Sequence, residues 1–151
     1  IQFHGDEPAA ECAALAGRLQ RPFWRAARIP TGGTAPFDLL EFAHDFAQAQ
    51  ALLLDAYVQG YGGGGRTFDW SQLPANIPAH LVLAGGLTPA NVSAGIAALR
   101  GRGLSLAVDV SSGVEADGPD GQPLKGIKDA DKIDRFVAAV RAADAAHPHL
   151  P

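Results

Sequence analysis

The sequence has 151 residues, of which 47% are hydrophobic and 19% are charged, a balance that is typical of one globular domain with a buried core. A formal net charge of −4 with only 12 lysines and arginines argues against a nucleic-acid or anionic-membrane surface. No apolar run approaches the roughly 20 residues that span a bilayer. A single cysteine excludes a disulfide scaffold and a multi-cysteine zinc site. No basic and apolar leader opens the chain, so we expect a cytoplasmic protein.

Strand and helix patterns alternate along the chain. Apolar runs with strand character occupy residues 1–5, 23–29, 51–56, 80–84 and 104–110. Amphipathic spacing predicts helices over residues 8–19, 39–46, 88–99 and 129–140. The second of these helices follows Thr34 and Pro36, and the last begins near Asp129. The segment 71–78 holds a short helix at best, residues 116–126 are expected to form a surface excursion, and the tail 147–151 is expected to be frayed.

The spacing of these elements predicts βα units and a parallel sheet, because each strand start is followed by a helix before the next strand begins. Five units allow either an open doubly wound sheet or part of a (β/α)₈ barrel, which needs eight strands. The opening residues 1–5 are typical of a strand already under way. This favours a barrel of which the chain holds strands four to eight with their helices, so that residues 1–146 form the C-terminal part of one barrel domain.

Glycine and serine residues follow the last two predicted strands. Gly85 and Gly86 precede a helix start at Thr88, and Ser112 and Gly113 follow the final strand. Backbone N–H groups in such strand-to-helix turns can bind an anion, and phosphate-binding barrels hold phosphate after strands seven and eight. Tight turns alone would also explain single glycines. Their occurrence on consecutive strands favours a phosphate site.

Three titratable residues lie at predicted strand ends. Asp55 ends an apolar strand, where partial removal from water suits a carboxyl group to general-acid catalysis, although capping of the next loop explains it equally well. Asp109 lies inside the last strand run, so it must pair with a ligand hydroxyl or a buried donor. His4 ends the opening strand, and only its position favours a role in a site. Cys12 lies on the apolar stripe of a helix and is expected in the core.

A glycine-rich segment follows the strand of Asp55. Gly62 to Gly65 are four consecutive glycines, and Phe68 and Trp70 come directly behind them. A plain flexible connector would not need these aromatic residues, whereas a lid over a site could use them. The segment is not a P-loop, because no Gly-Lys-Ser/Thr sequence closes it.

These segments together resemble the phosphoribosylanthranilate isomerase family, in order and at similar spacing. The resemblance is carried by residues 2–7, 53–55, 62–70, 83–87 and 108–115, and it runs from residue 1 to about residue 140. It implies a (β/α)₈ barrel of tryptophan biosynthesis that converts N-(5-phosphoribosyl)anthranilate to 1-(2-carboxyphenylamino)-1-deoxyribulose 5-phosphate. This Amadori rearrangement uses no metal or organic cofactor. The implied partner is a phosphorylated small molecule, and the implied assembly is a monomer or homodimer.

The resemblance also implies roles for individual residues. Asp55 matches the general acid that protonates the furanose ring oxygen. The phosphate-binding turns match Gly85, Gly86, Ser112 and Gly113, whereas His4 and Asp109 match polar positions that face the substrate. The family's general base is a cysteine at the end of its first strand, in a Lys-Ile-Cys-Gly-like segment that this sequence does not contain. Cys12 is not its counterpart, and a substrate-binding arginine of the second βα loop is also missing. We therefore expect no isomerase activity from these 151 residues alone.

Two alternatives use the same residues differently. Another phosphate-binding barrel enzyme would need a metal-binding His/Asp set or a catalytic Lys and Glu. No lysine occurs in the five strand runs, and His4 is the only histidine at a carboxyl end. The second alternative is a non-catalytic, flavodoxin-like module of five strands that holds a phosphorylated ligand. It leaves the mid-strand opening and the position of Asp55 beside the glycine-rich segment unexplained.

Overall fold

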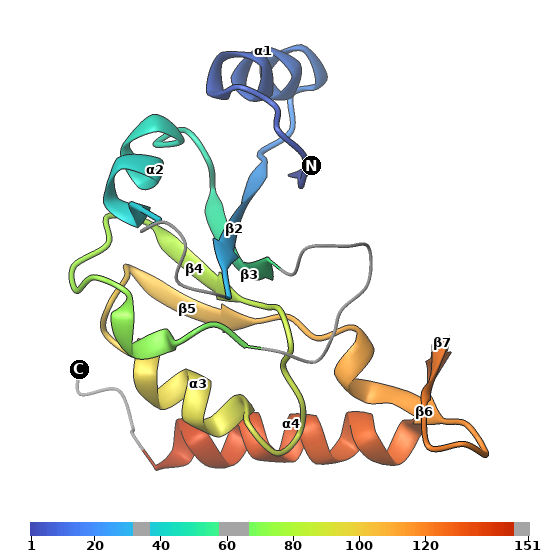
Figure 1. Ribbon diagram of the computed structural model, residues 1–151. Helices are drawn as coiled ribbons and strands as arrows, with labels where there is room; N and C mark the ends of the chain where they lie inside the picture. The colour runs from blue at the N-terminus through green and yellow to red at the C-terminus, as the bar shows by residue number, and fades with distance from the viewer. Residues whose placement is uncertain (32–36, 58–66, 147–151) are drawn as a thin grey trace.

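The computed structural model describes residues 1–31, 37–57 and 67–146. Its elements, in chain order, are β1 (Gln2–Phe3), α1 (Ala9–Leu19), β2 (Trp24–Pro30), α2 (Leu39–Asp45), β3 (Ala51–Tyr57), η1 (Trp70–Gln72), β4 (His80–Leu83), α3 (Val92–Leu99), β5 (Ser105–Val108), η2 (Ser112–Val114), β6 (Glu115–Asp117), β7 (Pro123–Lys128) and α4 (Ala130–Ala145). The helices follow one another in an arc around the strands, with α3 and α4 side by side (Figure 1). No helix within the described ranges is long and apolar enough to cross a membrane.

The main sheet has its strands in sequential order. Within the described residues, β1 to β5 pair in the order β1-β2-β3-β4-β5, and every pairing is parallel. The predicted α/β fold with a parallel sheet is thereby confirmed. A flavodoxin-like sheet has the order 2-1-3-4-5, because its chain reverses direction after the first two strands. The flavodoxin-like alternative is therefore wrong.

Among the described residues, all four α-helices pack on the same face of the sheet. Buried residues of all four α-helices in the described part of the chain join one cluster with alternate residues of the strands, including Leu52, Leu54, Leu81 and Leu83. The opposite, inner face carries a separate small cluster formed by Ala26, Ala51, Leu53, Val82 and Ala84. Because side chains alternate along a strand, β2, β3 and β4 contribute to both clusters. A doubly wound sheet would place helices on both faces, so this arrangement is the one found in barrels.

Aspartate side chains cap α2 and α4, whereas the predicted helix start at Thr88 is wrong, because residues 89–91 form a turn and α3 begins at Val92. Asp129 caps α4, because its Oδ1 accepts a hydrogen bond from Lys132 N at 2.8 Å, and this start was predicted. The cap of α2 is Asp38, whose Oδ1 accepts from the backbone N–H groups of the first helical turn. The start that the sequence predicted for this helix, at Thr34 and Pro36, lies outside the described residues. Cys12 is fully buried, as predicted.

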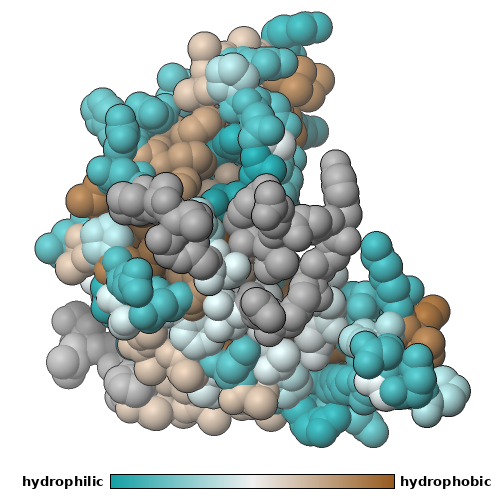
Figure 2. Space-filling view, viewed as in Figure 1, coloured by the Kyte–Doolittle hydropathy of each residue, from teal (hydrophilic) through white to brown (hydrophobic). Residues whose placement is uncertain are grey.

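The excursion predicted over residues 116–126 is a β-hairpin. Strands β6 and β7 pair antiparallel, and the turn between them is closed by Gly118 N, which donates to Gln122 O at 2.7 Å. The carboxylate of Asp120 accepts from Gln122 N at 3.1 Å. Apolar side chains reach the surface over this hairpin, where Leu124 and Ile127 are exposed (Figure 2). The Pro-Asp-Gly sequence at residues 119–121 is a turn signal that could have predicted the hairpin.

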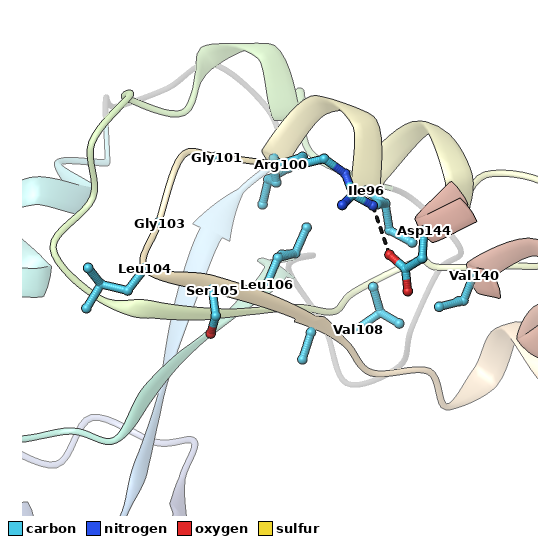
Figure 3. A pocket seen from close by; sticks show the side chains of 12 residues that line it. Ile96, Arg100, Gly101, Gly103, Leu104, Ser105, Leu106, Val108, Val140 and Asp144 are labelled. Carbon is cyan, nitrogen blue, oxygen red and sulfur yellow. Dashed lines mark hydrogen bonds and ion pairs between the residues drawn. The ribbon is translucent and has the colours of Figure 1, made fainter. Parts of the chain in front are cut away.

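Both ends of the sheet are free strand edges. Among the described residues, β1 pairs only with β2, and β5 pairs only with β4. A cavity of about 450 Å³ lies along β5, between this strand and the helices α3 and α4 (Figure 3). Leu106 and Val108 line it from the strand, and the Arg100–Asp144 ion pair at 2.8 Å lies beside it.

Candidate active site

Two of the predicted site residues, distant in sequence, form a direct contact at the carboxyl end of the sheet. His4 Nε2 lies 2.9 Å from Asp55 Oδ2, and the side chains are 45% and 27% exposed. Gln2 Nε2 lies 3.2 Å from His4 Nδ1. The two ring nitrogens thus contact different side chains, Nδ1 the Gln2 amide and Nε2 the Asp55 carboxyl group. The contact between His4 and Asp55 is accessible to solvent.

The turn after β4 lies against the strand that carries Asp55. Gly85 has a φ of +68°, and a Cβ atom there would lie 2.2 Å from Ala56 N and 2.6 Å from Asp55 Oδ1. Only glycine fits this position, both because of the left-handed backbone and because of the close approach. The Gly85 turn and the carboxylate of Asp55 are consequently direct neighbours.

Asn91 holds the same turn in place. Its Oδ1 accepts from Thr88 N at 2.8 Å, and its Nδ2 donates to Gly86 O at 3.0 Å. This side chain satisfies two backbone groups that the loop would otherwise expose, which fixes the path from Gly86 into α3. The sequence analysis missed Asn91. The sequence feature that could have indicated this role is an asparagine three residues after a threonine at a predicted helix start.

The turns after β4 and β5 touch each other. A Cβ atom at Gly113 would lie 1.7 Å from Leu87 O, so the two backbones are in contact at this point. Ser112 begins η2, and the preceding Ser111 is braced by Lys128, whose Nζ donates to Ser111 O at 2.8 Å. The two turns predicted to bind phosphate, which contain Gly85, Gly86, Ser112 and Gly113, therefore form one continuous surface.

The interpretation of Asp109 as an interior strand residue is wrong. Strand β5 ends at Val108, and Asp109 is exposed directly behind it. Its backbone N–H still donates to Leu83 O at 2.8 Å. The ladder ends here because Leu83 is the last residue of β4, and β5 has no second neighbour among the described residues to extend it. The position at the carboxyl end of the sheet remains compatible with a ligand contact.

Two arginines of β2 near the site were missed by the sequence analysis. Arg28 is aligned with Asp55 across the β2–β3 ladder and forms an ion pair with Asp6. Its position could have been predicted, because Arg28 stands two residues after Ala26 and side chains two residues apart point to the same face of a strand, here the inner face. Arg25 is only 5% exposed and lies on the opposite face, among the helices. No rule of composition or spacing predicts a buried arginine there.

The glycine-rich segment, Gly62 to Gly65, lies outside the described residues. Behind it, Phe68 is buried, and Asp69 caps η1. The hydroxyl and backbone N–H of Ser71, followed by the amide of Gln72, hold the pKa of Asp69 below its usual range. These contacts explain Phe68 and Asp69 structurally. The cavity along β5 contains none of the predicted site residues, because it lies beside the strand and not at its carboxyl end.

Comparison with known proteins identifies the family. Residues 1–139 match the family described as N-(5'-phosphoribosyl)anthranilate (PRA) isomerase. The N-(5'-phosphoribosyl)anthranilate isomerase of Methylibium petroleiphilum is 54% identical over 145 residues, which cover 96% of this chain and 59% of that protein. The chain thus spans about three fifths of the length of this curated relative.

Solved structures lead to the same family. The phosphoribosylanthranilate isomerase of Thermotoga maritima superposes with a TM-score of 0.66 at 32% identity, covering 94% of this chain and 61% of that one. A second phosphoribosylanthranilate isomerase, in complex with reduced 1-(o-carboxyphenylamino)-1-deoxyribulose 5-phosphate, gives a TM-score of 0.59 at 29% identity, covering 94% of this chain and 59% of that one. The chain belongs to the N-(5'-phosphoribosyl)anthranilate isomerase family.

Proposed function

We propose that the protein containing this chain is a barrel isomerase that converts N-(5-phosphoribosyl)anthranilate to 1-(2-carboxyphenylamino)-1-deoxyribulose 5-phosphate. The observation that carries the proposal is the contact between Asp55, His4 and the glycine turns. An acid–base pair stands 2.9 Å apart, and the turn of Gly85 packs directly against its carboxylate. The related structure bound to reduced 1-(o-carboxyphenylamino)-1-deoxyribulose 5-phosphate supports a phosphorylated ligand of this class.

Asp55 is the proposed general acid. Its carboxyl proton is transferred to the furanose ring oxygen, the bond from that oxygen to C1 breaks, and the lone pair of the anthranilate nitrogen forms a C=N bond to C1, which opens the ring. His4 Nε2, 2.9 Å from Asp55 Oδ2, holds the carboxyl group in place for this step. A base then removes the proton from C2, and the electrons of that C–H bond form a double bond between C1 and C2. The resulting enamine becomes the ketose. The partly exposed carboxylate supports this role because substrate can reach it.

The two glycine turns are the proposed phosphate site. Gly85, Gly86, Ser112 and Gly113 lie on turns that touch at Leu87, and backbone N–H groups there need no arginine to bind a dianion. Asp109, exposed at the end of β5, is the proposed contact to a substrate hydroxyl. The glycine turns and the acid then contact different groups of one small molecule.

The five strands are proposed to be strands four to eight of a (β/α)₈ barrel, with residues 1–146 as part of one domain. Three observations support this: the sequential parallel order, the helices on one face, and the free edges at β1 and β5. A closed barrel has no free edge, so both must pair with further strands. A cytoplasmic monomer or homodimer is the proposed form.

The acid is tested by following turnover as the loss of anthranilate-type fluorescence, using the product of the complete reading frame that encodes this sequence. Asp55→Ala is expected to lower kcat by about 10²- to 10⁴-fold, because it removes a general acid. The control is Asp134→Ala, an exposed carboxylate on α4, which should leave kcat unchanged. A folded wild-type protein without turnover would overturn the proposed isomerase.

The 151 residues alone are expected to show no turnover. Cys12 is the only cysteine, it is fully buried, and its Sγ donates to Glu7 O at 3.9 Å, away from Asp55. Burial raises the pKa of Cys12, which disfavours the thiolate that a base would need. Adding the part of the Methylibium petroleiphilum relative that this chain does not match is expected to restore turnover. Activity of the 151 residues by themselves would show that another group supplies the base.

A further inference from the structure

The backbone at His4 lies outside the ladder of the sheet. Strand β1 consists of Gln2 and Phe3, so the pairing with β2 ends one residue before His4. The imidazole nevertheless lies 2.9 Å from Asp55 Oδ2, across the width of β2. A half-exposed side chain on an unpaired backbone would sample several positions. Its alignment with Asp55 therefore needs a separate explanation.

Arg25 and Glu7 hold the backbone on both sides of His4. Arg25 Nη1 donates to Phe3 O at 3.3 Å, and its Nη2 donates to Gly5 O at 3.0 Å. Arg25 Nη1 also lies 3.2 Å from Glu7 Oε2, and that oxygen accepts from Gly5 N at 3.0 Å. The peptide groups immediately before and after His4 are thus fixed by one guanidinium and one carboxylate.

Stability alone does not account for an arginine at this place. Ala27 and Ile29, which point to the same face of β2, are apolar and buried. Arg25 is 5% exposed, and its Nε has no acceptor among the described residues. Packing over the ring of Phe46, 4.9 Å away, offsets part of the desolvation. A buried ion pair of this kind is a weak source of stability compared with apolar packing, but its hydrogen bonds fix the orientation of the groups that they join.

We propose that Arg25 and Glu7 are positioning residues that hold His4, and through His4 the carboxyl group of Asp55, in the geometry of the acid step. The proposal rests on the proposed function of Asp55. The fork of Arg25 fixes two carbonyl oxygens, and Glu7 fixes the N–H between them, so the backbone from which the imidazole projects can move only if one of these bonds breaks. Arg25 is buried on the helix-facing side of the sheet and acts through this backbone.

The kinetic experiment uses the product of the complete reading frame. Arg25→Met keeps the length of the side chain and removes the fork, and it is expected to lower kcat by roughly 10- to 100-fold while KM stays within about threefold. Arg25→Lys keeps the charge and one bond and should recover part of the loss. The matched control is Arg100→Met, which removes another partly buried ion pair, between α3 and α4, and should destabilise without lowering kcat.

A spectroscopic readout separates positioning from general loss of structure. In the wild-type background, Asp55→Asn is expected to shift the ¹⁵N resonance of His4 Nε2, because the two side chains share a hydrogen bond. In the Arg25→Met background this shift change should fall by at least half. If Arg25→Met does not fold, Glu7→Gln, which is isosteric, is measured in the same way.

The two readouts distinguish failure of this inference from failure of the proposed function. An active wild type whose Arg25→Met variant keeps both kcat and the full His4 shift change would overturn the positioning role. A folded wild type without turnover, in which the shift change still depends on Arg25, would overturn the function of the site but support the hold on His4. Loss of kcat in Arg100→Met as large as in Arg25→Met would also overturn the proposal, because general destabilisation would then explain both.

Discussion

The two halves of the candidate site are built by different physical means. On the side of β1 to β3, polar and charged side chains set the geometry: His4 contacts Asp55, and Arg25 holds the backbone on either side of His4. On the side of β4 and β5, the backbone at Gly85 and at Gly113 packs directly against neighbouring segments. The turns can pack this closely only because glycine has no side chain. The half that contains the proposed acid Asp55 (the acid half) should therefore respond to changes of charge and hydrogen bonding. The half that contains the proposed phosphate turns of Gly85 and Gly113 (the phosphate half) should respond to a single added methyl group.

The strongest test of this difference is Gly113→Ala. The new Cβ would lie 1.7 Å from Leu87 O, and backbone cannot move aside as a side chain can, so the two turns must separate. We expect a loss of about 3 kcal/mol in the free energy of unfolding, the upper part of the range for overpacking. Chemical denaturation measures the loss, and KM for the substrate should rise at the same time. Stability equal to wild type would show that the turns are not in contact.

A second test removes a side chain from the phosphate half without adding volume. Asn91→Ala leaves Thr88 N and Gly86 O without their partner, which should cost about 1–2 kcal/mol of stability. KM should rise while kcat changes little, because the acid is untouched. The same measurements on Asn91→Asp give the control: the Oδ1 acceptor remains and only the donor to Gly86 is lost. A selective loss of kcat would contradict the division of the site into two halves.

The opposite sign is expected where a glycine meets no neighbour. Gly17 lies exposed in α1, and a Cβ atom there finds nothing within 4 Å. Gly17→Ala should therefore stabilise the fold by about 0.5–1 kcal/mol, the helix propensity difference between the two residues. Thermal unfolding measures the gain, and a loss would show that volume is restricted outside the site as well.

The smallest effect concerns pH and the hairpin that braces the phosphate half. The N–H of Gly126 and, more weakly, the ammonium of Lys128 hold the pKa of Glu115 below its ordinary value of 4.5. A pKa that is lower in the folded state than in the unfolded state adds stability at pH values above the ordinary pKa. This added stability is lost as the pH falls through the pKa of the folded state. The unfolding free energy should thus decrease between about pH 5 and pH 3 more steeply in wild type than in Glu115→Gln. Equal slopes would show that Glu115 does not contribute.

How far the sequence predicts this molecule depends on how local each feature is. The βα order and the burial of Cys12 follow from the spacing of apolar residues and are confirmed. The contact of His4 with Asp55 depends on three strands lying in register, which no local pattern encodes. Asp109 was misplaced because the end of β5 is decided by the length of β4 and not by its own residues. Arg25 was missed because its partners are carbonyl oxygens, which every residue carries.

The position of Gly85 ties the two halves together, and this has a consequence for how the sequence can change. A side chain at residue 85 would meet Ala56 N and the carboxylate of Asp55 at once, so relief for it would have to come from the strand that carries the acid. Substitutions in the two halves therefore cannot be accumulated independently. A saturation library at position 85 should return glycine alone, and any other residue should be recovered only with a compensating change at position 55 or 56. Evolution of the proposed phosphate turn is thereby constrained by the proposed acid.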